Sequence, residues 1–399
     1  MDARVPPIPP RYDDYARGLR AFISSHQPHL RWKPRTGMRV PESAEDVSAL
    51  RAWVAELHEA GYGLARFSED EADPFEQRIL ERELAATGLP YILGNPLVSG
   101  ALKAFGTPEQ KRQYLASMSS GRHIWTQLFS EPGAGSDLTS LQTRGRLDGE
   151  QYVIDGQKVW STWAQWADFG YLLARTEPTG GSAGITALIL DMNSSGVEVR
   201  PLREMTGTTD FNEVFFDSVR VPVANVIDRP GEGWKVAQAS LVTERSSVGG
   251  GGLTDTVSGL LALAGRVERN GRPAIRDQAV RQQIAGLAAR ARVHGYLGCA
   301  TATRSLRGSS SPADAPMTKV WFSEVNLAAA EYALDLQGPR AAVVEGDPDS
   351  LEDGRWQDMF LYARAWTIAG GSNEVMRNVI AERGLGLPRE PRGNPAASS

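Results

Sequence analysis

The chain has little of what marks a secreted, membrane-spanning or nucleic-acid-binding protein. It has one cysteine, Cys299, in 399 residues, so no disulfide can form within the chain and we expect a reducing, cytoplasmic compartment. The sequence holds no apolar run long enough to span a bilayer, and its N-terminal segment lacks the apolar stretch of a signal peptide. A net charge of −5 gives no reason to expect nucleic acid or an anionic membrane as a partner.

What is present is the composition of a globular protein, with 41% hydrophobic and 23% charged residues, in a chain long enough for two or three domains. Residues 10–122 have a helical pattern. The segment 47–61 places Leu50, Val54 and Leu57 at helical spacing, and Thr107 followed by Pro108 predicts the start of another helix.

Between residues 123 and 235 the pattern changes to short β-rich segments. Asp148-Gly149 and Asp155-Gly156 are good turn dipeptides between them. From residue 236 the pattern is helical again, with two long amphipathic stretches typical of an antiparallel bundle. We therefore predict a mainly α protein with a central β domain, divided into residues 1–122, 123–235 and 236–399.

The segment QLFSEPGAGSD, Gln127–Asp137, carries the strongest chemical signal. A Gly-x-Gly-Ser turn exposes backbone N–H groups and Ser136 adds a hydroxyl, a combination suited to a pyrophosphate. The pattern is not GxGxxG, which disfavours a nicotinamide site. About 30 residues later, KVWSTWAQWAD places Trp160, Ser161 and Thr162 on a strand that can neighbour the first, where an indole and a hydroxyl suit a flat conjugated ring.

These segments, together with FNEVFFDSVRVP, GEGW and AGGSNEVMRNVIAERGLGLPRE, resemble the acyl-CoA dehydrogenases over roughly residues 107–387. The resemblance implies an N-terminal helical domain, a middle β-barrel-like domain and a C-terminal four-helix bundle. It also implies FAD, an acyl-CoA or acyl-carrier-protein thioester as substrate, and an electron-transfer flavoprotein as electron acceptor. A homodimer or homotetramer follows from the family's cofactor site, and a heterotetramer stays open.

The resemblance also implies which residues bind the cofactor; it assigns no metal. The predicted FAD-binding residues are Gln127, Phe129, Ser130, Gly135, Ser136, Trp160, Ser161, Thr162, Arg269, Gln282, Gly338, Gly371, Ser372 and Glu374.

The α-C–H of a thioester is a weak acid, so its removal needs a carboxylate base and donors at the carbonyl oxygen. In many family members this glutamate stands where the present chain has Gly370. A second subgroup, resembling isovaleryl-CoA dehydrogenase, carries it on the first helix of the bundle, and the matching residue is Glu244. We therefore predict Glu244 as the base, with Ser136, Arg245 and Gly370 at the substrate.

Three alternatives stay open. Glu244 and Arg245 also fit a solvated pair on a helix surface. A missing glutamate at Gly370 suits relatives that are flavin monooxygenases or oxidases, and the chain also fits the non-catalytic subunit of a heteromeric dehydrogenase. Four glycines, Gly249–Gly252, follow the predicted base and remove side-chain volume, which predicts a bulky or branched acyl group.

Overall fold

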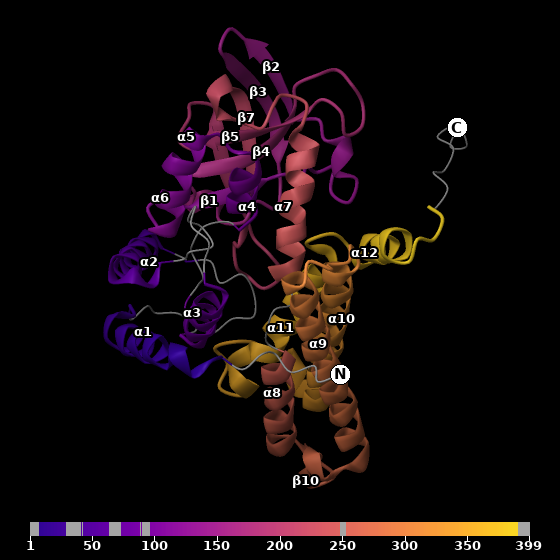
Figure 1. Cartoon of the computed structure of the whole chain (residues 1–399). Helices are drawn as coiled ribbons and strands as arrows, with labels where there is room; N and C mark the ends of the chain where they lie inside the picture. Colours follow the sequence, from indigo (N-terminus) through magenta and orange to yellow (C-terminus); the bar gives the residue numbers. More distant parts are fainter. Residues whose placement is uncertain are drawn as a thin grey trace, which may run out of the picture. The chain divides into compact units, whose positions relative to one another are not determined.

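The computed structural model describes residues 8–28, 41, 43–63, 73–87, 89, 96–247 and 253–389 (Figure 1). The chain forms two compact units, Pro7–Glu244 and the chain from Arg245 onwards. The boundary between them falls within one helix, α7 (Gly233–Ser247).

The first unit begins with helices whose ends and buried faces follow from the sequence. The Ser43 side chain accepts from the Asp46 N–H and starts α2, which buries Leu50, Val54 and Leu57 as predicted. Thr107 and Gln110 form a capping box at the next predicted start. The helical segments are η1 (Pro10–Tyr12), α1 (Asp13–His26), α2 (Ala44–Leu57), η2 (His58–Tyr62), α3 (Pro74–Ala86), α4 (Pro96–Phe105), α5 (Pro108–Gln110), η4 (Lys111–Leu115) and α6 (Ala116–Ser119).

Eight strands in the described part of the chain form one sheet, in the order β6-β7-β3-β2-β4-β5-β8, with β1 paired to β4. The β1–β4 pairing is parallel and joins Gln127 to Tyr171. The strands are β1 (Trp125–Leu128), β2 (Arg144–Asp148), β3 (Gln151–Lys158), β4 (Phe169–Arg175), β5 (Ile185–Asp191), β6 (Val197–Leu202), β7 (Phe211–Pro222) and β8 (Val226–Ile227).

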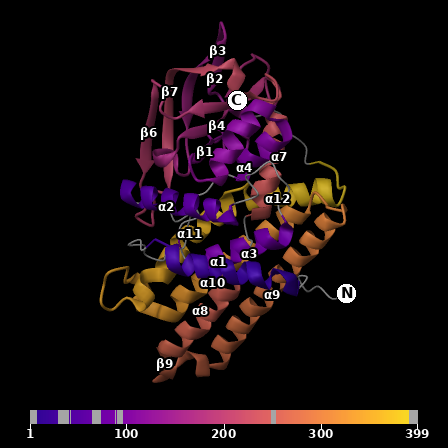
Figure 2. The ribbon, with the colours of Figure 1, turned by 60° about the vertical axis from the view of Figure 1, so that its left-hand side comes forward.

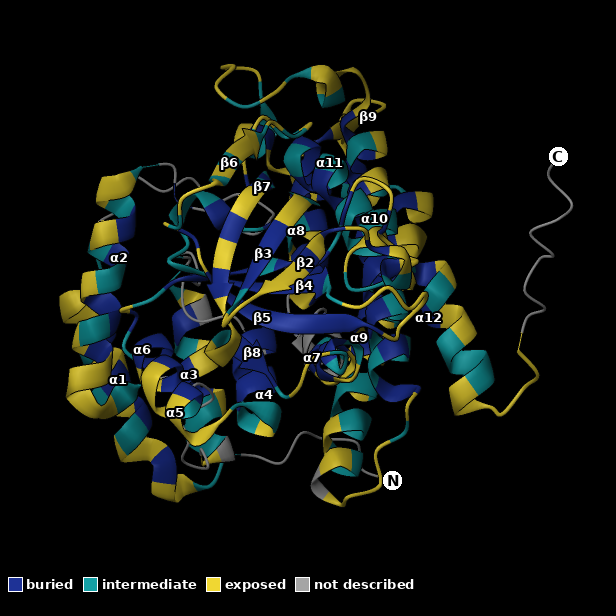
Figure 3. Cartoon of the chain, turned by 90° about the horizontal axis from the view of Figure 1, so that it is seen from above, coloured by how far each residue is buried: buried dark blue, intermediate teal, exposed yellow. Residues whose placement is uncertain are grey.

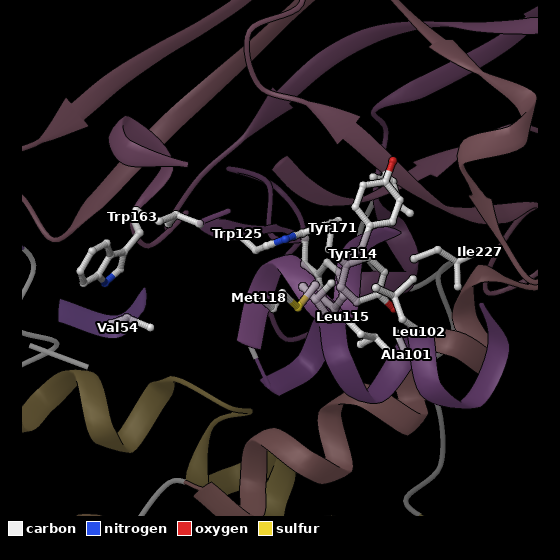
Figure 4. Close-up of a cluster of buried hydrophobic side chains, with 14 of the residues drawn as sticks. Val54, Ala101, Leu102, Tyr114, Leu115, Met118, Trp125, Trp163, Tyr171 and Ile227 are labelled. Atoms are coloured by element: carbon white, nitrogen blue, oxygen red, sulfur yellow. The ribbon is translucent and has the colours of Figure 1, made fainter. Parts of the chain in front are cut away.

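Both faces of β4 and β5 are covered, and β5 is buried along nearly its whole length (Figure 3). Along β4, Tyr171 and Leu173 belong to one apolar cluster while Leu172 and Ala174 belong to another, which places the two clusters on opposite faces of the sheet. Figure 4 shows the first cluster, where Tyr114 meets Trp125 edge to face at a centroid distance of 5.2 Å. This cluster fixes the N-terminal helices to the sheet.

The second unit is a helical bundle. Figures 1 and 2 both show α9 and α10 side by side, and α8, α10 and α11 share one apolar cluster with α9 around the fully buried Trp356. Its elements are α8 (Leu253–Arg266), β9 (Glu268–Arg269), β10 (Arg272–Pro273), α9 (Gln278–Leu306), α10 (Asp314–Gln337), α11 (Arg355–Ile368), α12 (Asn373–Val379) and the π-helical turn η11 (Ile380–Gly384).

The predicted fold class is confirmed, while the predicted limits after residues 122 and 235 stay predictions. Asp148-Gly149 does form the turn between β2 and β3, with Gly149 at φ +65°. The expectation for Asp155-Gly156 was wrong. Gly156 lies inside β3 at a register shift against β7, where a Cβ would approach the Thr143 Cα to 2.8 Å, so close backbone approach rather than a turn requires this glycine.

Candidate functional site

The turn predicted to hold phosphates is exposed at the surface of the first unit. Glu131 and Ala134 exchange two backbone hydrogen bonds of 3.0 Å and close it. Gly133, Gly135 and Ser136 are exposed, and within the described residues their backbone N–H groups have no hydrogen-bond partner. A Cβ added at either glycine would meet no atom within 4 Å. The turn therefore presents unused donors at an open surface, as an anion site requires.

The segment after β3 lies beside this turn, but it is not a strand. The expectation that Trp160, Ser161 and Thr162 lie on a strand was wrong, because Trp160 and Trp163 adopt positive φ angles of +60° and +67° that end the extended backbone. Two hydrogen bonds nevertheless join this segment to the segment 126–130, as predicted for neighbouring segments. Val159 N–H donates to the Ser130 carbonyl at 2.9 Å and the Thr126 hydroxyl to the Thr162 carbonyl at 2.8 Å.

Side chains in this segment differ in what they can offer a ligand. The Trp160 indole is 59% exposed and meets Phe211 edge to face, so one large flat surface is open. Ser161 is fully buried, and its hydroxyl has no partner within the described residues. Phe129 is also buried, with its ring against Tyr171 at 4.8 Å. Gln127, on β1, and Thr162 are half-buried.

An ion pair beneath the turn was missed by the sequence reasoning. Lys158 is fully buried, and its Nζ lies 2.8 Å from Glu131 Oε1. Burial opposes ionisation of both groups: it lowers the pKa of Lys158 to about 8 despite Glu131. Burial likewise acts to raise the pKa of Glu131, but Lys158 and the neighbouring N–H groups hold that pKa below its ordinary value. The sequence could have suggested this ion pair, because the motif SEPGAGSD contains Glu131 and the motif DGQKVWST contains Lys158.

A second glycine turn lies in the second unit, between α11 and α12. Gly370 and Gly371 have φ angles of +69° and +93°, which glycine adopts readily. A Cβ at Gly371 would approach the Met376 Cε to 2.6 Å. Ser372 caps α12 by accepting from the Val375 N–H at 3.3 Å, and the Glu374 side chain is exposed. The positive φ angles of the turn therefore favour glycine at both positions, whatever else lies against them.

This second turn is also held by a buried lysine, which the sequence reasoning missed. Lys319 on α10 donates to the Gly371 carbonyl at 2.8 Å, to Asn373 Oδ1 at 2.8 Å and to the Thr367 carbonyl at 3.2 Å. Asn373 Oδ1 also accepts from the Ser323 hydroxyl at 3.0 Å. The sequence could have suggested a buried lysine here, because Lys319 stands among apolar residues of a predicted helix.

The other predicted residues are spread over separate elements. Arg269 is exposed in the β9–β10 hairpin, and Gln282 is exposed near the start of α9. Gly338 ends α10 with φ +58° and ψ −132°, a conformation that favours glycine. Glu244 and Arg245 lie in α7, but their side chains are outside the described residues, as are Gly249–Gly252.

A hollow elsewhere in the first unit contains none of the predicted residues. It has a volume of about 440 Å³ and is lined by α2, by the segment just before β4 and by a residue just after β5, including Ser48, Arg51, Trp166, Asp168 and Asn193. Arg51 is already engaged there, with Nη2 3.0 Å from Asp168 Oδ2.

The residues around the first turn fit FAD as the resemblance implies. Unused N–H donors at Gly133, Gly135 and Ser136 suit a pyrophosphate, and the exposed Trp160 indole suits one face of a flat ring. The donors are neutral backbone groups, in keeping with the absence of strong net charge.

Comparison with known proteins identifies the class. Three family models match, for the N-terminal domain at residues 17–122, the middle domain at 126–219 and the C-terminal domain at 231–385 of acyl-CoA dehydrogenase. The chain belongs to the acyl-CoA dehydrogenase family. It is an oxidoreductase acting on CH–CH groups, in a family whose members use FAD.

The chain is also similar to individual members of the family and to solved structures. The chain is 40% identical over 305 residues to the acyl-CoA dehydrogenase IpdE1 of Mycobacterium tuberculosis, covering 75% of this chain and 76% of that protein. Its fold matches a solved structure described as Tcur3481-Tcur3483 steroid ACAD with a TM-score of 0.80 and 27% identity, over 98% of this chain and 100% of that one. The ChsE4-ChsE5 complex from Mycobacterium tuberculosis matches with a TM-score of 0.78 and 28% identity, over 96% and 99%.

The helices in the described part of the chain include none with both the length and the apolar character needed to cross a membrane.

Proposed function

We propose that the protein catalyses the FAD-dependent α,β-dehydrogenation of an acyl thioester carried by coenzyme A or an acyl carrier protein. Membership of the family supports the reaction class. The observation that carries the cofactor assignment is the exposed turn with unused N–H groups at Gly133, Gly135 and Ser136, hydrogen-bonded to the Trp160 segment through Ser130 and Val159. The well-folded protein should therefore purify yellow, with about one FAD per chain; a colourless protein that cannot be reconstituted would refute the assignment.

In the proposed reaction Glu244 removes the α-proton of the thioester, and Gly370 and Arg245 lie along the substrate. Bound FAD supplies the hydride acceptor at its N5 atom. Glu244 is chosen because the alternative position for the base is Gly370, which has no side chain and whose φ of +69° is rare for a glutamate. One carboxylate is enough, since two close together would raise the pKa of one of them.

Replacing the proposed base tests the mechanism. Glu244→Gln should retain FAD but slow anaerobic bleaching of the flavin by acyl-CoA by about 10²–10⁴-fold, the usual contribution of a positioned general base. Glu374→Gln tests the nearest rival for the base, because Glu374 is exposed next to the second glycine turn. Wild-type bleaching by Glu244→Gln, or slow bleaching by Glu374→Gln alone, would contradict the assignment.

The proposed substrate carries a bulky acyl group, with a polycyclic one as the leading candidate. The absence of side-chain volume at Gly249–Gly252, after the predicted base, supports this, and so does the likeness to a structure described as a steroid ACAD. Bleaching rates with butyryl-, isobutyryl- and steroid-acyl-CoA should increase along that series. Preference for butyryl-CoA would contradict the proposal.

The chain is proposed to act in an oligomer, with an electron-transfer flavoprotein as electron acceptor. A heteromeric assembly is the second candidate, because two matched structures are described with paired names, Tcur3481-Tcur3483 and ChsE4-ChsE5. Light scattering of the chain expressed alone, compared with the chain co-expressed with a homologous partner, separates the two. FAD bound tightly by a monomer would contradict both.

A further inference from the structure

The buried pair Lys158–Glu131 has no role in the proposed chemistry. Lys158 is fully buried, Glu131 is 8% exposed, and Nζ and Oε1 lie 2.8 Å apart. Desolvating two charges often costs as much free energy as their attraction returns, and an apolar replacement is often as stable. Stability alone is therefore a weak explanation for placing this pair under an exposed turn.

The pair's hydrogen bonds converge on the turn. Lys158 Nζ donates to the Phe129 carbonyl at 2.9 Å, just before the turn. Glu131 accepts from the Gln142 N–H at 2.6 Å and from the Thr143 N–H at 2.9 Å, which ties it to the chain entering β2. The residue that closes the turn through its backbone thus anchors it through its side chain.

The tip of the turn at Gly133 and the residues just after it have no comparable anchor within the described part of the chain. Gly133, Gly135 and Ser136 are exposed, and added Cβ atoms at the two glycines would contact nothing within 4 Å. Exposed segments with few packed contacts open readily. Pro132 restricts its own backbone. The conformation of its neighbours depends on the Glu131 and Ala134 backbone hydrogen bonds that close the turn.

We propose that the Lys158–Glu131 pair is a positioning device that holds the Glu131–Ala134 turn in its binding conformation before FAD binds. The inference rests on the proposed FAD site. If a cofactor has to order the turn, its apparent dissociation constant rises by the inverse of the fraction of chains already ordered. The carboxylate and ammonium keep that fraction high because both are hydrogen-bonded to backbone on either side of the turn.

The test uses the double variant Lys158→Met/Glu131→Gln in the full-length protein. It leaves no unpaired buried charge, so it folds even where either single variant does not. We expect a thermal midpoint near that of the wild type and an FAD dissociation constant at least about tenfold higher, corresponding to a turn that is ordered a tenth of the time or less. Quenching of FAD fluorescence measures this binding without turnover.

Hydrogen exchange of the FAD-free protein gives a second, independent measurement. The Ala134 amide donates to the Glu131 carbonyl, a backbone bond that the substitutions do not remove. The peptide spanning residues 131–137 should exchange faster in the double variant than in the wild type if the pair holds the turn.

Thr186→Val is the matched control. Thr186 is fully buried in the same sheet, but its hydroxyl bonds Thr176 and the Gly231 N–H rather than the turn. This variant should lower the thermal midpoint while leaving FAD affinity and exchange at residues 131–137 unchanged. Wild-type affinity and exchange in the double variant, or an equal loss of affinity in Thr186→Val, would overturn the proposal. If wild-type protein binds no FAD, the proposed function fails, and the exchange measurement still decides whether the pair holds the turn.

Discussion

The two glycine turns of this protein, one in each unit, are held by buried lysines that are satisfied in different ways. Under the first turn, Lys158 pairs with a carboxylate, Glu131, at 2.8 Å. Under the second, Lys319 donates to neutral oxygens of Thr367, Gly371 and Asn373, at 2.8–3.2 Å. An ammonium removed from water can thus be stabilised either by an opposite charge or by several oriented dipoles.

The difference matters for how each turn responds to losing its lysine. A carboxylate left alone in the first unit can relieve its own buried charge by taking up a proton. Carbonyl and amide oxygens around Lys319 cannot do so near neutral pH. Loss of its lysine therefore makes the first turn sensitive to pH through Glu131, whereas the oxygens of Thr367, Gly371 and Asn373 bind no proton near neutral pH.

Removing Lys319 should have the largest effect. In Lys319→Met, the carbonyls of Thr367 and Gly371 lose a charged donor, while Asn373 Oδ1 keeps its bond from Ser323. Each acceptor left without a partner costs about 1–3 kcal/mol. We expect the free energy of unfolding of the second unit to fall by about 3–5 kcal/mol, measured by urea denaturation. The control is Lys235→Met, at a half-exposed lysine paired with Asp228, which should cost less than about 1 kcal/mol. Equal effects of the two substitutions would contradict this account of the second turn.

The stability of Lys158→Met should depend on pH through the carboxylate that the substitution leaves behind. In Lys158→Met, Glu131 is buried without its cation, so its folded-state pKa rises above the unfolded value and protonation then favours the folded state. The destabilisation caused by Lys158→Met should therefore shrink, by about 1–2 kcal/mol, as the pH falls from about 7 to 5. The three oxygens that lose their donor in Lys319→Met take up no proton in this range, so they add no such change. A Lys158→Met penalty that grows in acid would show that Glu131 does not carry the buried charge.

The glycines of the turns should respond differently to alanine. Gly371→Ala places a Cβ 2.6 Å from the Met376 Cε in a backbone with φ +93°, and we expect a loss of about 1–2 kcal/mol in the free energy of unfolding. Gly133→Ala meets no atom within 4 Å and has no positive φ, so the change should stay within about 0.5 kcal/mol. A large loss at Gly133 would mean that the first turn is packed more tightly than its contacts indicate.

Periodicity and capping predicted the helices because both depend on local sequence. Leu50, Val54 and Leu57 lie on the buried face of α2, and Thr107 caps the helix that follows it, as expected. The turn at Asp148-Gly149 was predicted for the same reason. The place of Gly156 inside β3 was not predicted. The Thr143 backbone requires that glycine, and Thr143 is a neighbour across the sheet that no local pattern reveals.

The candidate site likewise has one part that local sequence predicts and another that it does not. The Gly-x-Gly-Ser motif predicted the exposed backbone N–H groups at Gly135 and Ser136, because an anion site of this kind is a local feature. The two lysines that hold the turns were missed because their partners, Glu131 and Asn373, are 27 and 54 residues away along the chain. Pairings of that kind follow from the tertiary fold rather than from spacing. The role of Glu244 stays a prediction.

The smallest expected effect concerns a buried histidine in the second unit and sharpens the contrast in proton linkage. His294 on α9 is 8% exposed, and its Nε2 has no hydrogen-bond partner within the described residues. Burial lowers the pKa of His294, so in the folded state the ring stays neutral at a pH where the unfolded chain, with a pKa of about 6.5, already binds a proton. The unfolded state then binds more protons, and the second unit should lose stability as the pH falls from about 7.5 to 5.5, by at most about 1.4 kcal/mol for each unit of pKa shift. In His294→Phe, whose ring can pack against Phe322 as the imidazole does, this loss should disappear. His26→Gln, at an exposed position on α1, should leave it unchanged. Urea denaturation monitored by hydrogen exchange of α9 peptides measures the slope, and an unchanged slope in His294→Phe would assign the proton linkage of the second unit to another group.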